Sequence, residues 1–157
     1  MPGTYYPPTG FHFRVSFSGV SGMSSDDHQR FQDVGGLSFE IETESFREGG
    51  ENRFEYKFPK RVKYPNLVLK RGMITSKVLT DWIKDAMNGF FYASPVPFFQ
   101  PSDILITLMN EDGQPVAIWN VVQAYPVKWS MSDLKATENA VVVETVELAY
   151  QYFERQM

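Results

Sequence analysis

The feature that most constrains the fold is an alternation of apolar and polar residues, which recurs along most of the 157-residue chain. In the stretch FHFRVSF, every second residue from Phe11 to Phe17 is apolar, and the residues between them are polar. A period of two is typical of β-strands that bury one face. The sequence therefore predicts a mainly β fold.

Further stretches share this pattern and are predicted to be strands. They cover residues 37–42, 53–58, 65–70, 104–109, 116–122, 127–131 and 141–153. The turn-forming sequence NEDGQP at 110–115 predicts a hairpin between two of them. In the first two stretches, the alternating apolar residues are expected to face the core. These residues are Leu37, Phe39, Ile41, Phe54, Tyr56 and Phe58.

One segment, TSKVLTDWIKDAMNG, has the period of an α-helix instead. Its apolar residues fall on one helical face, namely Leu79, Trp82, Ile83, Ala86 and Met87. We predict a helix over about residues 76–88, and Gly89 suits the left-handed position that ends many helices. The predicted architecture is a small antiparallel β-barrel or sandwich with one flanking α-helix.

The chain has the length of one domain, so we expect residues 1–157 to form a single unit. Residues 1–10, rich in proline, glycine and tyrosine, are expected to form an extended N-terminal segment. Two irregular loops are expected at 21–30 and 90–102, and the second contains three prolines.

Composition excludes several classes of function. The chain has no cysteine, a net charge of −4 and a pI near 5.2, which argue against disulfides, thiolate metal sites and a specific nucleic-acid partner. No apolar run approaches the roughly 18–20 residues of a membrane helix, so we expect no stable membrane insertion. The segment MPGTYYPPTG lacks the features of a secretory signal, and we expect the protein to be made in the cytoplasm.

Motifs for catalysis are also missing from the sequence. It contains no phosphate-binding loop, no dinucleotide-binding turn and no nucleophile elbow. His28 lies beside two aspartates, but adjacent residues of one loop rarely converge on one metal ion. Glu48 and Glu51 lie beside arginines and glycines, where carboxylates are expected to be hydrated and paired with cations. We therefore expect a protein that is not an enzyme and has no cofactor.

The stretch REGGENR at 47–53 joins two oppositely charged segments. Acidic residues concentrate in 40–55, and lysines and arginines concentrate in 53–71. Two interpretations are open at this point. The charges can belong to two solvated strand faces, or they can form a self-complementary surface through which one copy contacts the next.

Five motifs follow one another in an order that resembles the phage tail tube protein family. They are G-L-x-x-E, E-G-G-x-N-x-F, L-x-L-K-R-G, A-Y-P-x-K-W and E-x-x-x-L-x-Y-x-Y-F. The resemblance covers about residues 31–153. It is to the branch found in contractile tails and phage-tail-like injection particles, which is related in fold to the haemolysin-coregulated protein of type VI secretion.

This resemblance implies a structural inner-tube protein. Six copies would form a ring with a β-lined lumen, and the rings would stack into a hollow tube inside a contractile sheath. Besides itself, its partners would be the sheath protein and the baseplate and tail-terminator proteins, and the lumen would leave room for cargo. Such a protein belongs to a phage tail or to an injection particle that is released or anchored to a cell.

The resemblance also assigns roles to residues. The loop that contacts the neighbouring ring would comprise Arg47, Glu48, Gly49, Gly50, Glu51, Asn52 and Arg53. The helix would lie outside the tube and present a polar face to the sheath, with Lys77, Asp81, Lys84 and Asp85. Polar candidates for the lumen are Thr145, Glu147 and Gln151.

Two alternatives remain open. The loops at 21–30 and 90–102 exceed what a tube protein of this kind needs, which fits a specialised copy that starts the tube at the baseplate. In another class of function, a closed β-barrel binds a small apolar ligand inside it.

Overall fold

The computed structural model describes residues 11–20, 29–50, 52–72, 77–91, 101–137 and 141–157, with the backbone alone at 29–30 and 89–91. The N-terminal segment 1–10 and most of the two expected loops, at 21–28 and 92–100, lie outside these residues. The elements are β1 (His12–Ser18), β2 (Gln29–Phe31), β3 (Asp33–Gly35), β4 (Glu40–Phe46), β5 (Tyr56–Lys63), β6 (Leu67–Gly72), α1 (Val78–Phe91), β7 (Ser102–Met109), β8 (Pro115–Met131), β9 (Val143–Ala149) and β10 (Tyr152–Arg155).

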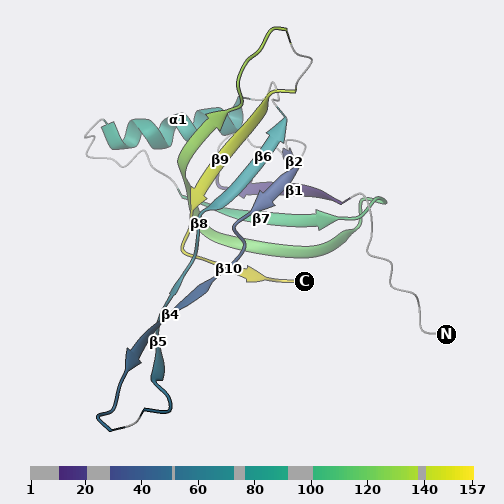
Figure 1. The fold of residues 1–157 in the computed structure, drawn as a ribbon. Coiled ribbons are helices and arrows are strands. Elements are labelled where there is room, and N and C mark those ends of the chain that lie inside the picture. The colour runs from purple at the N-terminus through teal and green to yellow at the C-terminus, as the bar shows by residue number, and fades with distance from the viewer. Residues whose placement is uncertain (1–10, 21–28, 51, 73–76, 92–100, 138–140) are drawn as a thin grey trace, which may run out of the picture.

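Most strands belong to one antiparallel sheet that curls into a barrel (Figure 1). Its strand order is β2-β1-β7-β8-β9-β6-β3, and β10 pairs with β8 beside this path. The two end strands, β2 and β3, are separated only by Gln32, whose backbone N–H donates to the carbonyl of Lys70 at 2.9 Å. One continuous chain segment therefore links β1 to β6 and closes the sheet. The prediction of a mainly β, antiparallel fold with one helix is confirmed.

Strand β8 is the corner of the barrel. Its first half pairs with β7 and β10, and its second half pairs with β9. Between the halves, Gln123 has a φ of 54°, and its backbone N–H donates to Asp103 Oδ1 at 2.9 Å. The sequence predicts two separate strands here, over 116–122 and 127–131, on either side of a short gap that includes Pro126. The proline is accommodated at a register shift between Pro126 and Lys128, so the strand continues.

The predicted strand at 141–153 is two strands in the structure, β9 and β10. The chain leaves β9 after Ala149, and β10 then pairs with the first half of β8 instead of the second. The backbone N–H of Gln151 donates to the carbonyl of Val122 at 3.0 Å and fixes this change of partner. Alternation continues across the break, which is why the sequence alone does not reveal it.

The barrel encloses an apolar core contributed by nearly all of its strands and by α1. Its most buried members are Val15, Phe31, Leu67, Leu69, Leu79, Ile104, Ile106, Val121, Val146 and Leu148. Each fully buried side chain of this size contributes roughly 1.5–3 kcal/mol to folding. Apolar side chains thus fill the interior of the barrel. The alternative function, binding of a small apolar ligand inside the barrel, therefore has no support from the structure.

Helix α1 packs on the barrel through Leu79, Trp82 and Ala86, as its spacing predicts. The ring of Trp82 meets that of Phe17 edge-on, with centroids 5.5 Å apart. The helix begins and ends later than predicted, and it includes Gly89. Glycine costs a helix only about 1 kcal/mol, so it need not end one. No helix in the described part of the chain is long and apolar enough to cross a membrane.

Strands β4 and β5 contradict one prediction. Phe39, Ile41, Phe54, Tyr56 and Phe58, which the alternation assigns to the core, are 41–62% exposed. The two strands pair only with each other, in a separate two-stranded sheet. Among the described residues, no second layer covers either face, so the alternation here marks an amphipathic surface and not a core strand.

One ion pair lies inside the barrel. Arg71 and Glu144 are only 1% and 5% exposed, and Arg71 Nε donates to Glu144 Oε2 at 2.6 Å. The indole N–H of Trp129 donates to the other carboxylate oxygen at 2.6 Å. Within the described residues, Arg71 Nη1 is buried without a hydrogen-bond partner. The carboxylate is thus well satisfied, and the guanidinium is not fully so.

We predict that Arg71→Met destabilises the fold by about 3–5 kcal/mol, because it leaves the Glu144 carboxylate buried without a cation. The double variant Arg71→Met with Glu144→Gln removes both charges and keeps an acceptor for Trp129, and it should regain most of this stability. Urea-induced unfolding followed by tryptophan fluorescence measures both effects. Equal instability of the single and double variants would contradict this account of the pair.

Candidate functional site

The β4–β5 ribbon extends away from the barrel as an arm (Figure 1). Its tip holds the residues predicted to contact a neighbouring ring. Those that the structure describes are all exposed, namely Arg47, Glu48, Gly49, Gly50, Asn52 and Arg53. Glu51 lies outside the described residues. Gly50 has a φ of 99°, which glycine adopts readily, so the glycine pair serves the turn. The structure therefore brings the predicted loop to the point farthest along the arm.

The charges of the arm pair with each other inside one copy. Glu42 binds both Arg61 and Lys63 across the ribbon, and these two hydrogen bonds, with that from Arg61 the larger cause, lower its pKa below the usual range. Lys60 Nζ lies 3.8 Å from the carboxylate of Glu44. Near the tip, Arg47 Nε donates to Glu55 Oε1 at 2.8 Å. Within one copy, the charges of the arm are therefore exposed and largely paired with each other, and its complementarity to a second copy stays a prediction.

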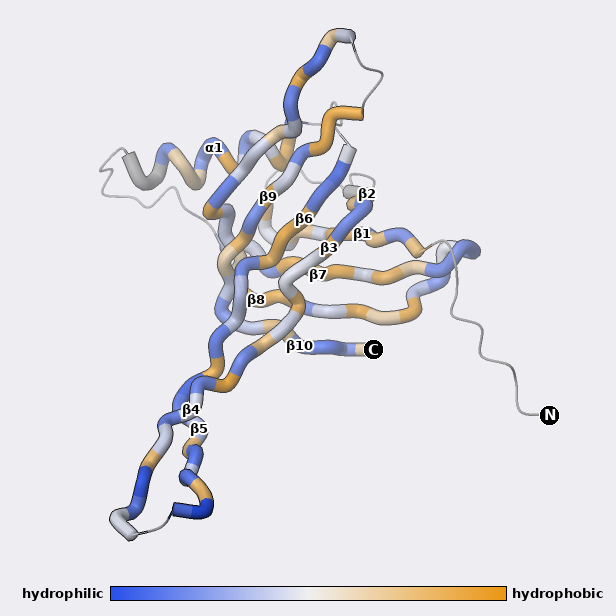
Figure 2. The backbone as a smooth tube through the Cα atoms, in the orientation of Figure 1, coloured by the Kyte–Doolittle hydropathy of each residue, from blue (hydrophilic) through white to orange (hydrophobic). Residues whose placement is uncertain are grey.

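A β-bulge divides the arm into two parts with different apolar faces. The register shifts between Glu42 and Thr43. On the tip side of the bulge, Phe46 pairs with Tyr56 and Glu44 pairs with Phe58, so these side chains share one face. On the barrel side, Ile41 pairs with Val62 and belongs to the opposite face. Figure 2 shows apolar residues on both strands of the arm, outside the barrel.

The tip half of the arm carries an aromatic surface, which we define as Phe46, Phe54, Tyr56 and Phe58. The rings of Phe54 and Tyr56 meet edge-on at 5.1 Å, and those of Tyr56 and Phe58 stack at 6.3 Å. All four side chains are at least 41% exposed. Contiguous exposed apolar groups mark surfaces that contact other molecules. Sequence reasoning missed this surface because the same alternation is produced by a core strand.

The base of the arm is fixed to the barrel. Gly36 has a φ of +90°, and a Cβ at this position would lie 2.1 Å from the backbone oxygen of Asn66. The hydroxyl of Tyr150 donates to the carbonyl of Gly36 at 3.0 Å. Burial, together with Tyr64, raises the pKa of Tyr150 to about 12, so this hydroxyl keeps its proton. The ring of Tyr64 also packs against those of Tyr150 and Phe153, with centroids 5.7 Å away in each case. The direction of the arm is therefore set by close packing.

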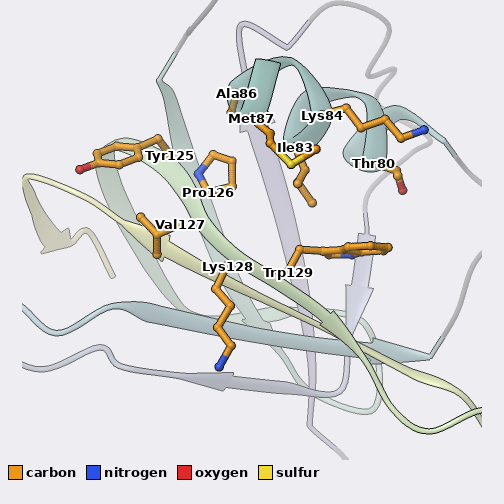
Figure 3. A pocket seen from close by; sticks show the side chains of 10 residues that line it. All are labelled: Thr80, Ile83, Lys84, Ala86, Met87, Tyr125, Pro126, Val127, Lys128 and Trp129. Carbon is orange, nitrogen blue, oxygen red and sulfur yellow. The ribbon is translucent and has the colours of Figure 1, made fainter. Parts of the chain in front are cut away.

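The predicted polar face of the helix is exposed, with Lys77 directly before α1 and Asp81, Lys84 and Asp85 within it. One apolar residue differs from its prediction, because Met87 is 53% exposed. It lines a hollow of about 450 Å³ between α1 and the second half of β8 (Figure 3). We call this hollow the α1–β8 groove. Its lining includes Ile83, Lys84, Met87, Tyr125, Val127 and Trp129.

Two of the three lumen candidates lie together. Thr145 and Glu147 occupy the face of β9 opposite to the buried Val146, and Glu147 lies 3.6 Å from Lys128. Gln151 comes after β9 has ended and belongs to the turn before β10. Within the described ranges, no three histidine or acidic side chains are placed to hold a metal ion.

A barrel filled by its core, with a rigidly based arm that exposes aromatic rings, defines a structural protein built to contact other copies or partners. Residues 9–154 match the family described as the T4-like virus tail tube protein gp19. The chain belongs to this family. It is a structural, non-enzymatic tail tube protein of contractile phage-tail-like injection systems and a component of a phage tail or contractile injection particle.

Solved structures agree with this assignment. The chain is 28% identical to a chain of the anti-feeding prophage (AFP) baseplate, with 96% of each chain covered and a TM-score of 0.73. It is 26% identical to a chain of the PVC sheath–tube complex of an extracellular contractile injection system, with 98% and 93% covered and a TM-score of 0.74. Hcp1 from Salmonella typhimurium, at 15% identity, 92% and 85% coverage and a TM-score of 0.58, shares the fold. A comparison with curated proteins finds no match.

We predict that Gly36→Ala destabilises the protein far more than Gly113→Ala. Both glycines have a positive φ, which costs alanine roughly 1–2 kcal/mol. A Cβ at Gly113 meets nothing within 4 Å, whereas a Cβ at Gly36 collides with the backbone of Asn66. Thermal unfolding of the two variants separates the cost of the steric clash with Asn66 from the cost of the positive φ. Similar melting temperatures would show that the base of the arm is not closely packed.

Proposed function

We propose that this protein forms hexameric rings that stack into the hollow inner tube of a contractile injection particle. The observation that carries the proposal is the aromatic surface of the arm, which the barrel of its own copy leaves uncovered. Burying such a surface against other copies is favourable, since each large apolar side chain gains roughly 1.5–3 kcal/mol. The sixfold symmetry is supported by the similarity to a chain of the AFP baseplate, whose structure is sixfold symmetrised.

We assign the arm to the contact between rings. Rings that stack head to tail need two different surfaces, one at each end of the subunit, because such a contact does not close on itself. The arm supplies a surface that extends beyond one end of the barrel (Figure 1). Its tip at 47–53 would be the part that reaches the neighbouring ring.

We assign the polar face of α1 to the sheath and the polar face of β9 to the lumen. The similar PVC chain comes from a sheath–tube complex, which supports a sheath as partner. Lys77, directly before α1, and Asp81, Lys84 and Asp85 within it are exposed and do not belong to the core. Thr145 and Glu147 would line the lumen, whose polar wall leaves passage for cargo, and Gln151 would lie at its margin.

For the position along the tube, we propose the shaft, with the baseplate-proximal copy as second candidate. Similar chains occur in a sheath–tube complex, in a baseplate and in the cap that terminates the AFP tube. These structures support baseplate and terminator proteins as further partners. We expect assembly in the cytoplasm, before the particle is released or anchored to a cell.

Replacing residues 48–52 by a short Gly/Ser turn should leave sixfold rings and abolish long tubes. The tip is exposed and contributes nothing to the core, so folding should survive its loss. Negative-stain microscopy measures ring symmetry and tube length in the same sample. A matched control replaces the exposed charges Glu111 and Asp112 of the β7–β8 turn by Gly/Ser and should form tubes of normal length. Long tubes from the tip-shortened chain would contradict the role of the arm.

The double variant Asp81→Lys with Asp85→Lys should form normal tubes that bind sheath poorly. Both side chains are exposed on α1 and opposite to Leu79 and Trp82, so the core is untouched. Sheath co-sedimentation with preformed tubes measures binding. A control with the same change of charge, Glu111→Lys with Asp112→Lys, should keep normal binding. Undiminished sheath binding by the helix variant would refute the assignment of this face.

A further inference from the structure

The α1–β8 groove is apolar, open and walled by large side chains. Met87, Val127 and Trp129 remain 53%, 48% and 42% exposed around it. Figure 3 shows Ile83 and Met87 directed from α1 towards β8, across the groove from Val127 and Trp129. The hydrogen bond of Trp129 Nε1 to the buried Glu144 holds the indole in place. With about 450 Å³, the groove falls within the size of pockets that enclose small ligands, and it has room for aromatic side chains.

The groove and the arm belong to opposite ends of the subunit. In Figure 1, α1 and the end of β8 lie at one end of the barrel, and the arm leaves the other end. Strands of seven and eight residues extend about 25 Å at roughly 3.3 Å per residue. In a head-to-tail stack, the arm of each copy therefore points towards the end at which the next copy presents its groove.

From these features we propose that the aromatic surface of the arm, Phe46, Phe54, Tyr56 and Phe58, docks into the α1–β8 groove of a copy in the next ring. This inference rests on the proposed tube and names the surface that receives the arm. Two half-exposed apolar surfaces of one chain become buried together, which removes from water the groups that neither barrel covers.

Charge complementarity supports this occupant. Lys84 lies at the rim of the groove and has no ion-pair partner among the described side chains. Glu44 lies on the aromatic face of the arm, directly across from Phe58, and its contact with Lys60 is a long one at 3.8 Å. Docking of the aromatic surface brings an exposed carboxylate towards an exposed ammonium group. Such an ion pair determines the register of the contact more than it contributes to the affinity.

The test uses the absence of cysteine from the chain. We would make Phe58→Cys and Met87→Cys as separate full-length variants, assemble them together, and oxidise the tubes gently. We expect covalent dimers on non-reducing gels from the mixture, and none from either variant alone. Dimers should also be lost from rings of the tip-shortened chain. The control mixture of Phe58→Cys with Asp112→Cys, an exposed turn residue away from the groove, should give no dimer.

A charge exchange provides a second measurement. Lys84→Glu should shorten tubes at low salt, because it places two carboxylates together, and Lys84→Glu combined with Glu44→Lys should restore their length. Tubes that form normally without the Phe58–Met87 dimer would overturn the docking and leave the proposed function intact. Protection of Met87→Cys from a thiol reagent only after sheath is added would also overturn the docking, because the sheath and not the arm would then occupy the groove. Failure of the unmodified chain to form any ring or tube would overturn both.

Discussion

The structure depends on one constraint, which is that an amphipathic two-stranded ribbon must be held rigid at its base while its apolar face stays uncovered. A ribbon of two strands is at best marginally stable alone. The barrel compensates for this at the junction, where Gly36 packs against the backbone of Asn66 and Tyr150 donates to the carbonyl of Gly36. The cross-strand pairs of Glu42 hold the ribbon together further out. The arm is therefore preorganised, and it would lose little conformational freedom on binding another molecule.

The barrel provides the rigid body that such an arm requires. Its sheet closes through the continuous segment from β2 to β3, and β8 turns the corner at Gln123. The buried pair of Arg71 and Glu144 fixes the arrangement of the side chains around it, because the Glu144 carboxylate also accepts a hydrogen bond from the indole of Trp129. Trp129 in turn forms a wall of the α1–β8 groove. The polar interaction inside the core and the apolar groove outside it are thus connected through one side chain.

Much of this fold is predictable from the sequence, and the failures have a common physical cause. Alternation predicts the strands and their core residues where the strand lies in the barrel, as for Val15 and Phe17 of β1. Alternation shows that one face avoids water, but it does not show which molecule covers that face. Tyr56 and Phe58 were therefore assigned to a core that does not exist in a single copy. The loop at 47–53 lies between two strands, as the alternation on either side of it predicts, and its contact with another ring stays a prediction. The groove depends on two segments that are distant in sequence.

The β-bulge in the arm separates a part near the barrel from a part near the tip, and the two parts have different apolar faces. Between Glu42 and Thr43 the register shifts, so the apolar residues near the barrel and those near the tip face opposite sides. Without the shift, Val62 would lie on the same face as Tyr56 and Phe58, and the exposed apolar face of β5 would extend along the whole strand. Dividing the face confines the aromatic surface to the tip half and places charged pairs on the same side near the barrel. The part of the arm that extends farthest from its own barrel is thus the part whose aromatic side chains are available for contact with another molecule.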